Sequence, residues 1–161
     1  MNRIKLLVIA VMLIPMTGFS QDQVDNLFNK YKDKEGVSVV NISKEFLGLV
    51  TGVSDSIASG ILSKLEGIRI LSVEDSTLNS SLDFYKELET NGGFKNKKFE
   101  VLIEATKNGE KMSLLGNKIN SKEYSELLFF SKGGNNSMIA IKGTISPESV
   151  SQILKLINIS F

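Results

Sequence analysis

The sequence predicts an α+β domain built on a sheet of about six strands, predominantly antiparallel or mixed, with helices packed on one face. Two observations carry this prediction. Helical and extended patterns are mixed in the first half of the chain, and four extended segments then follow one another before a final helix. Successive strands with helices set apart from them are typical of α+β folds, whereas regular alternation would indicate a parallel α/β fold.

The N-terminal residues have the pattern of a secretory signal peptide. Two basic residues precede an uncharged apolar run over residues 6–16, and the small residues Gly18 and Ser20 follow it. The run is short for a bilayer span. We expect cleavage after Ser20, which removes residues 1–20, with a retained N-terminal anchor as the alternative. Residues 21–161 then form a single domain, because a chain of this length with 42% hydrophobic residues builds one core.

The first half of the predicted domain mixes helices with strands. Apolar spacing and β-branched runs predict a strand over 37–43, a short helix over 44–50, a strand over 68–73 and, at the start, a helix with Val24, Leu27, Phe28 and Tyr31 on one face. Between the strands we expect a helix that is capped by residues 54–56, carries Leu65 on its apolar face and ends at Gly67. A strand, a helix and a strand in this order favour a parallel pair.

The middle of the chain predicts one helix and one hairpin. The helix should start at Asp75 or Ser76 and end at residues 91–93, with an apolar face of Leu78, Leu82, Tyr85 and Leu88. A strand over 99–105 should follow, with one side formed by Phe99, Val101, Ile103 and Ala105. The Asn108-Gly109 pair then predicts a tight turn, with a return arm on which Met112 and Leu114 alternate. Residues 118–123 read as a polar linker.

The last third predicts a hairpin covered by a helix. Residues 125–131 are apolar on both faces of a strand, so we expect cover on both sides or a partner. Residues 133–136 suit a tight turn into a strand over 138–145, whose core face is isoleucine-rich. Ser146-Pro147-Glu148 should start a helix. Its apolar stripe should cover the hairpin and comprises Val150, Ile153, Leu154 and Ile157, extended by Phe161.

Two residues of this hairpin test the predicted register. Phe129 and Ile141 each belong to an apolar face of their strand, so both should lie in the core. Replacing either with alanine should cost about 2–5 kcal/mol of folding free energy.

The amino-acid composition excludes several classes of catalytic and binding site. The chain contains no histidine and no cysteine, which removes the commonest general base, thiol nucleophiles and the usual ligands of transition metals. No serine is followed three residues later by lysine, and no phosphate-binding glycine loop is present. We therefore expect no catalytic, cofactor-binding or metal-binding residue. The absence of cysteine also argues against a lipoprotein.

The distribution of charged residues does not indicate a class of binding partner either. Without the signal peptide, 17 basic residues stand against 18 acidic ones, so the chain lacks the basic excess of a nucleic-acid-binding protein. Two acidic pairs remain as candidate carboxylate sites, Glu74 with Asp75 and Glu100 with Glu104. The second pair would lie about 13 Å apart on one strand. Solvation of the surface explains both pairs better than catalysis.

Several junctions in the chain resemble the DUF4252 family of small exported bacterial proteins. They are the signal ending in Ser20-Gln21, Phe28-x-x-Tyr31 followed by Gly36-Val-x-x-Val40, Leu65-x-Gly-Ile-x-Ile70, and Glu126-Leu-Leu-Phe-Phe. The likeness covers nearly all of the predicted mature chain. It implies a place in the envelope of Gram-negative bacteria, and it implies no catalytic or binding residue, because the family has no established activity.

Export and the missing catalytic chemistry favour a non-enzymatic protein of the periplasm, the outer membrane or the cell exterior. Such a protein would bind another envelope protein or sense the state of the envelope, without nucleic acid and without a transmembrane segment once the signal is removed. The alternative is a small-ligand carrier or a hydrolase that uses only carboxylate and hydroxyl groups. A deep apolar pocket ringed by polar groups would favour the alternative. An exposed apolar patch would favour the binding protein.

Overall fold

The computed structural model describes residues 22–51, 56–95 and 99–159. The predicted signal peptide, residues 54 and 55 of the predicted helix cap, and Phe161 lie outside this part of the chain. The elements follow in the order α2 (Gln23–Tyr31), β1 (Val37–Ser43), α3 (Lys44–Thr51), α4 (Ser56–Leu62), β2 (Leu65–Val73), the 3-10 turn η2 (Ser76–Leu78), α5 (Phe84–Thr90), β3 (Phe99–Lys107), β4 (Glu110–Asn120), β5 (Glu123–Lys132), β6 (Ser137–Ile145) and α6 (Pro147–Leu156).

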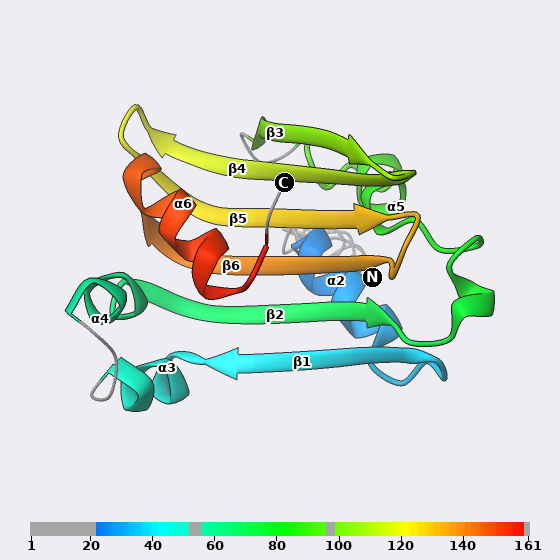
Figure 1. Ribbon diagram of the computed structural model, residues 1–161, viewed down its shortest axis with the longest axis horizontal. Helices are drawn as coiled ribbons and strands as arrows, with labels where there is room; N and C mark the ends of the chain where they lie inside the picture. The colour runs from blue at the N-terminus through cyan, green and yellow to red at the C-terminus, as the bar shows by residue number, and fades with distance from the viewer. Residues whose placement is uncertain (1–21, 52–55, 96–98, 160–161) are drawn as a thin grey trace, which may run out of the picture.

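The strands form one six-stranded sheet in the order β1-β2-β6-β5-β4-β3, as Figure 1 shows. All five neighbouring pairs are antiparallel. The α+β fold class predicted from the sequence is confirmed. β6 joins the two parts of the chain, because it pairs with β5 on one side and with β2, which lies far away in sequence, on the other.

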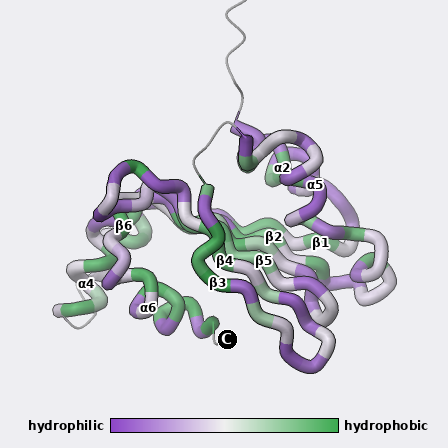
Figure 2. Tube along the Cα trace, turned by 90° about the horizontal axis from the view of Figure 1, so that it is seen from above, coloured by the Kyte–Doolittle hydropathy of each residue, from purple (hydrophilic) through white to green (hydrophobic). Residues whose placement is uncertain are grey.

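Helices cover both faces of the sheet, so the prediction of helices on one face is wrong. α2 and α5 lie on one side and α4 and α6 on the other (Figure 2). The reason is β5, whose Leu128 and Phe130 pack beneath α2 and α5 while Leu127 and Phe129 pack on the opposite side. We call these two sides the α2 face and the α6 face. All four side chains are at most 5% exposed.

β1 and β2 are antiparallel neighbours, so the predicted parallel pair is also wrong. Two short helices, α3 and α4, follow β1 and return the chain to the end of the sheet that it has just left (Figure 1). β2 begins at Leu65, three residues earlier than expected. Gly67 is therefore a strand residue opposite Ser43 and does not end a helix. The space above it is narrow, since a Cβ on Gly67 would lie 3.1 Å from the Ile42 carbonyl oxygen.

The single helix predicted after β2 is divided in two. The Asp75 side chain accepts a hydrogen bond from the Thr77 N–H at 2.9 Å and caps η2. The Asp83 side chain accepts from the Lys86 N–H at 3.0 Å and starts α5. Two capping aspartates therefore create two starts where apolar spacing predicted one. The four apolar residues of the predicted face nevertheless all pack on the α2 face.

The segment between η2 and α5 is held by Asn136, which is 1% exposed at the end of the β5–β6 turn. Its Nδ2 donates to the carbonyl oxygens of Asn79 at 2.6 Å and Leu82 at 2.7 Å. Its Oδ1 accepts from the Gly133 N–H at 3.0 Å. One buried amide thus fixes the hairpin turn and the break in the helix together.

β3 contains a bulge that the strict alternation of its side chains did not predict. Val101 lies opposite Leu115 and Ile103 opposite Leu114, which leaves Leu102 as the extra residue. A bulge moves all following side chains to the other face. Phe99 accordingly packs on the α2 face, whereas Ile103 and Ala105 pack on the α6 face. The four residues predicted to share one side do not share it.

The tight turn and the final helix predicted for the second half are present, with one exception among the predicted segments. The turn at Asn108 and Gly109 has positive φ values of 52° and 82°, as a tight hairpin requires. The exception is the predicted linker over 118–123, because β4 continues to Asn120 and β5 starts at Glu123. At the C-terminus, α6 covers the hairpin as predicted. Phe129 is 5% and Ile141 1% exposed, which confirms both as core residues.

Candidate functional site

A groove of about 400 Å³ lies between the first turn of α2 and the ends of β1, β2 and β6. It opens on the α2 face, where these strands extend beyond the cover of the helix. Polar side chains outnumber apolar ones in its lining, which consists of Asp25, Asn41, Ile42, Ser43, Glu66, Gly67, Arg69, Ala140 and Lys142.

The sequence of α2 places two carboxylates at the edge of this groove. Asp22 caps the helix, because its Oδ1 accepts a hydrogen bond from the Val24 N–H at 3.0 Å. Asp25 lies in the first turn, where the helix dipole favours negative charge. Further along the helix, Leu27 and Phe28 are 3% exposed and bind α2 to the sheet. The two carboxylates are therefore held by a helix that is anchored by its apolar face.

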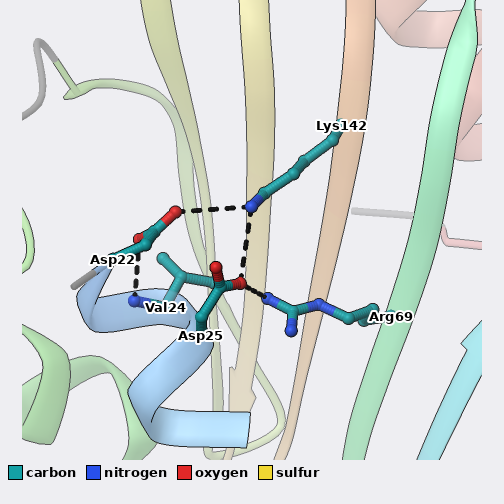
Figure 3. A network of polar contacts seen from close by, with 5 residues as sticks. All are labelled: Asp22, Val24, Asp25, Arg69 and Lys142. Atoms are coloured by element: carbon teal, nitrogen blue, oxygen red, sulfur yellow. Dashed lines mark hydrogen bonds and ion pairs between the residues drawn. The ribbon is translucent and has the colours of Figure 1, made fainter. Parts of the chain in front are cut away.

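Two cations reach these carboxylates from neighbouring strands (Figure 3). Lys142 Nζ lies 3.3 Å from Asp22 Oδ2 and 3.4 Å from Asp25 Oδ1. Arg69 donates to the same Asp25 oxygen, and its guanidinium lies 4.2 Å from the ring centre of Phe28. The register of β2 and β6 puts the two cations diagonally on one face. Each ion pair is partly exposed, so each should contribute about 0.2–1 kcal/mol.

The opposite end of α2 has a second polar anchor. Tyr31 donates a hydrogen bond from its hydroxyl to Glu87 Oε2 of α5 at 2.6 Å. Burial, together with the Glu87 carboxylate, raises the pKa of Tyr31 above its ordinary value. Lys30 forms an ion pair with the same carboxylate. The helix is consequently anchored by polar contacts at both ends, one of which forms the wall of the groove.

Sequence reasoning missed one buried acidic residue near the groove. Glu126 of β5 is 2% exposed and lies directly opposite Lys142 in the register of β5 and β6. It shares the α2 face with Leu128 and Phe130 because side chains alternate along the strand. The available signal was a single carboxylate at a core-facing position of an otherwise apolar strand. Burying a charge is costly without compensating partners. The position of Glu126 beside Lys142 places it at the end of the sheet where the charged residues of the groove lie.

The structure brings neither of the two predicted acidic pairs together as a site. The bulge in β3 turns Glu100 and Glu104 toward opposite faces. Glu100 accepts a hydrogen bond from the Tyr124 hydroxyl at 2.9 Å on the α6 face. Glu104 instead lies near Tyr85, which packs on the α2 face and whose pKa is raised by burial and by the negative charges of Glu89 and Glu104. Asp75 is occupied in capping η2, and hydrogen bonds from Thr77 lower its pKa. Neither pair lies in the groove.

A second surface of interest is apolar and lies on the helices of the α6 face. Large hydrophobic side chains are exposed on three of them, and we call this set the apolar helix surface: Phe46 (55%) and Leu49 (75%) on α3, Ile57 (63%) on α4 and Leu156 (48%) on α6. A shallow groove of about 250 Å³ separates α4 from α6, and Ile57, Leu156 and Lys155 line it. The same helices use other residues, such as Leu47, Ile61 and Ile153, to reach the core.

The chemistry available at these two surfaces differs. The α2 groove offers carboxylates, a guanidinium, an ammonium and hydroxyl and amide groups, so it can bind a small polar molecule. Among the described residues, no group of three or more acidic side chains could hold a metal ion. The apolar helix surface offers only van der Waals contact and water exclusion. No helix in the described ranges is both long enough and apolar enough to span a bilayer.

Comparison with known proteins places the chain in a family. The model of a domain of unknown function, DUF4252, matches residues 31–153. The match begins at the last residue of α2 and ends within α6, so it covers the entire sheet, including Arg69 and Lys142, but not Asp22 or Asp25. No curated protein and no solved structure matches the chain. Since the match spans most of the 161 residues, the protein belongs to the DUF4252 family.

Proposed function

We propose that this protein is an exported, non-enzymatic protein that binds another protein of the bacterial envelope. The observation that carries the proposal is the apolar helix surface. Leu49 and Ile57 are largely exposed and are not part of the core cluster on the α6 face, whereas Leu47 and Ile61 from the same two helices are. α4 contacts both α3 and α6, and large apolar side chains exposed on neighbouring helices are typical of protein contact sites. Export is supported by the basic, apolar and small residues that open the sequence.

The shape of this surface indicates the chemistry of the partner. The groove between α4 and α6 has room for one large apolar side chain and has Lys155 and Gln152 on its lining. Interfaces commonly combine a buried apolar anchor with a polar rim. The partner should therefore present an apolar anchor with an acidic group beside it, facing Lys155.

Photo-crosslinking in living cells tests the proposal at single positions. A photoreactive amino acid replaces Leu49 or Ile57 in the full chain, and Lys107 is replaced as a control, because it is exposed at the end of β3 away from these helices. Mass spectrometry should identify the same envelope protein from both test positions and not from the control. The Leu156→Asp substitution should abolish these adducts. Equal adducts from all three positions, or none from Leu49 and Ile57, would contradict the proposal.

A specific observation also supports a small-ligand carrier as the second candidate. The α2 groove is lined by charged and polar residues as well as by Ile42 and Ala140 and measures about 400 Å³, within the range of small-molecule sites. Native mass spectrometry of protein purified from its own host, sprayed without denaturant, tests this candidate. A reproducible bound mass that is lost in the Arg69→Met variant would favour the carrier, whereas the same mass in wild type and variant would exclude the groove.

A further inference from the structure

The two edges of the sheet differ in how they are protected against pairing. β3 at one edge carries Glu100 and Glu104 and contains the bulge at Leu102. β1 at the other edge has no charged residue, no proline and no bulge, since its register with β2 is continuous over seven residues. Charges and bulges are the devices by which native proteins block pairing at sheet edges. Of the two edge strands that the structure describes, β3 therefore carries features that block pairing and β1 does not.

The outer side of β1 offers regularly spaced backbone groups. The Gly36 carbonyl accepts a hydrogen bond from the Glu74 N–H at 2.9 Å, and the Ile42 carbonyl faces Gly67 of β2. Backbone groups of alternate residues point the same way in an antiparallel strand. The even-numbered residues of β1 thus bond to β2, and the outward groups belong to Val37, Val39, Asn41 and Ser43. Two of these groups are already used: the Val37 N–H donates to the Lys34 carbonyl at 3.2 Å, and the Ser43 carbonyl precedes the first turn of α3. Within the part of the chain that the structure describes, no strand pairs with this side.

These four residues match a second copy of the same strand. Antiparallel pairing about a two-fold axis at Val40 sets Val39 opposite Asn41 of the other copy, and Val37 opposite Ser43. In this register Val39 and Asn41 exchange both of their backbone hydrogen bonds, and the Ser43 N–H donates to the Val37 carbonyl, whereas an axis at Val39 or Asn41 allows fewer bonds. Val40 itself meets its own symmetry mate in a non-hydrogen-bonded pair, where side chains approach most closely. Its side chain is 43% exposed in the single chain.

We infer that β1 is a self-association edge, through which two copies of this chain join their sheets into one antiparallel sheet. Charge does not oppose this pairing, because β1 contains no ionisable side chain. Such isologous two-fold contacts are the commonest mode of homodimer formation. The inference is independent of the apolar helix surface and goes beyond the proposed function, since it concerns the backbone of an edge strand and not helical side chains, and a different partner.

Charge substitution at the two-fold axis tests the inference. Light scattering coupled to size-exclusion chromatography should show a dimer for the mature wild-type protein in a dilution series. Val40→Lys should abolish the dimer, and so should Val40→Glu, because each puts two like charges directly opposite one another. Mixing the two variants should restore it. The matched control is Val101→Lys on β3, a 50% exposed valine on the blocked edge, which should remain dimeric.

Single-cysteine variants test the register separately. This test remains valid even if a charged variant folds poorly. Because the chain has no native cysteine, Val40→Cys should form a disulfide-linked dimer under mild oxidation. The two copies of Ile42→Cys would lie about 13 Å apart along the strands and should not. A monomeric wild type at all concentrations, a dimer that survives Val40→Lys, or equal crosslinking at both positions would overturn the inference.

Discussion

Two adjacent leucines of β5 provide the sharpest test of helical cover on both faces. Leu127 and Leu128 are both 0% exposed, yet the first packs on the α6 face and the second on the α2 face. Replacing a buried leucine with alanine removes apolar contact and leaves a cavity, at a cost of about 2–5 kcal/mol. Leu127→Ala and Leu128→Ala should therefore each lower the free energy of unfolding by an amount in this range.

The double variant makes the test stricter. The two side chains pack in separate core clusters on opposite faces, so the double variant should lose roughly the sum of the two single costs, and any departure from that sum measures coupling through their shared backbone. Urea unfolding followed by circular dichroism measures all four proteins, and an unchanged slope with denaturant shows that only stability has changed. A cost below about 1 kcal/mol for either single variant would mean that its face is not covered, and would refute the two-sided core.

Three further predictions concern the turn, a helix cap and metals. Asn136→Ala should cost about 2–4 kcal/mol in the same urea assay, because two carbonyls lose a buried donor, whereas the exposed neighbour Asn135→Ala should change little. Burial raises the pKa of Asp83, but hydrogen bonds from Lys132 and the Lys86 N–H outweigh it and lower that pKa. The resulting stabilisation is present above about pH 4 and is lost as the pH falls through the folded-state pKa, so Asp83→Asn should lose less stability than wild type on acidification. Excess chelator should leave the Tm of the purified protein unchanged, and a clear drop would reveal a metal site built only from oxygen ligands, which no sequence pattern predicts.

Local patterns predicted most elements because each has a physical signature. Asn108-Gly109 supplies the positive φ values of a tight turn, and Ser146-Pro147-Glu148 supplies a helix start. The errors arose where a residue has two compatible roles. Asp83 can lie inside a helix or cap one, and only the buried amide of Asn136, remote in sequence, decides in favour of the cap. The bulge at Leu102 likewise depends on how β3 pairs with β4. The alternation of side chains within β3 carries no information about that pairing.

The candidate surfaces were less accessible from the sequence than the fold. The α2 groove needs Asp25, Arg69 and Lys142, which are separated by 44 and 73 positions and meet only through the order of the strands. The apolar helix surface was hidden for the opposite reason. Hydrophobic residues such as Leu49 and Ile57 cannot be told from core residues by residue type, yet short helices at a sheet end cannot bury every side.

The most direct measurement of the central claim asks whether the apolar helix surface is covered in the cell. Leu49→Cys, Ile57→Cys and, as control, Lys107→Cys are each the only thiol in the chain, and Val40→Lys in all three removes any contribution from self-pairing. Their rates of reaction with a small maleimide are compared in intact cells and in purified protein. A bound partner predicts slow labelling of Leu49→Cys and Ile57→Cys in cells only, with the control fast in both. Equal rates for all three in cells and in solution would contradict the account.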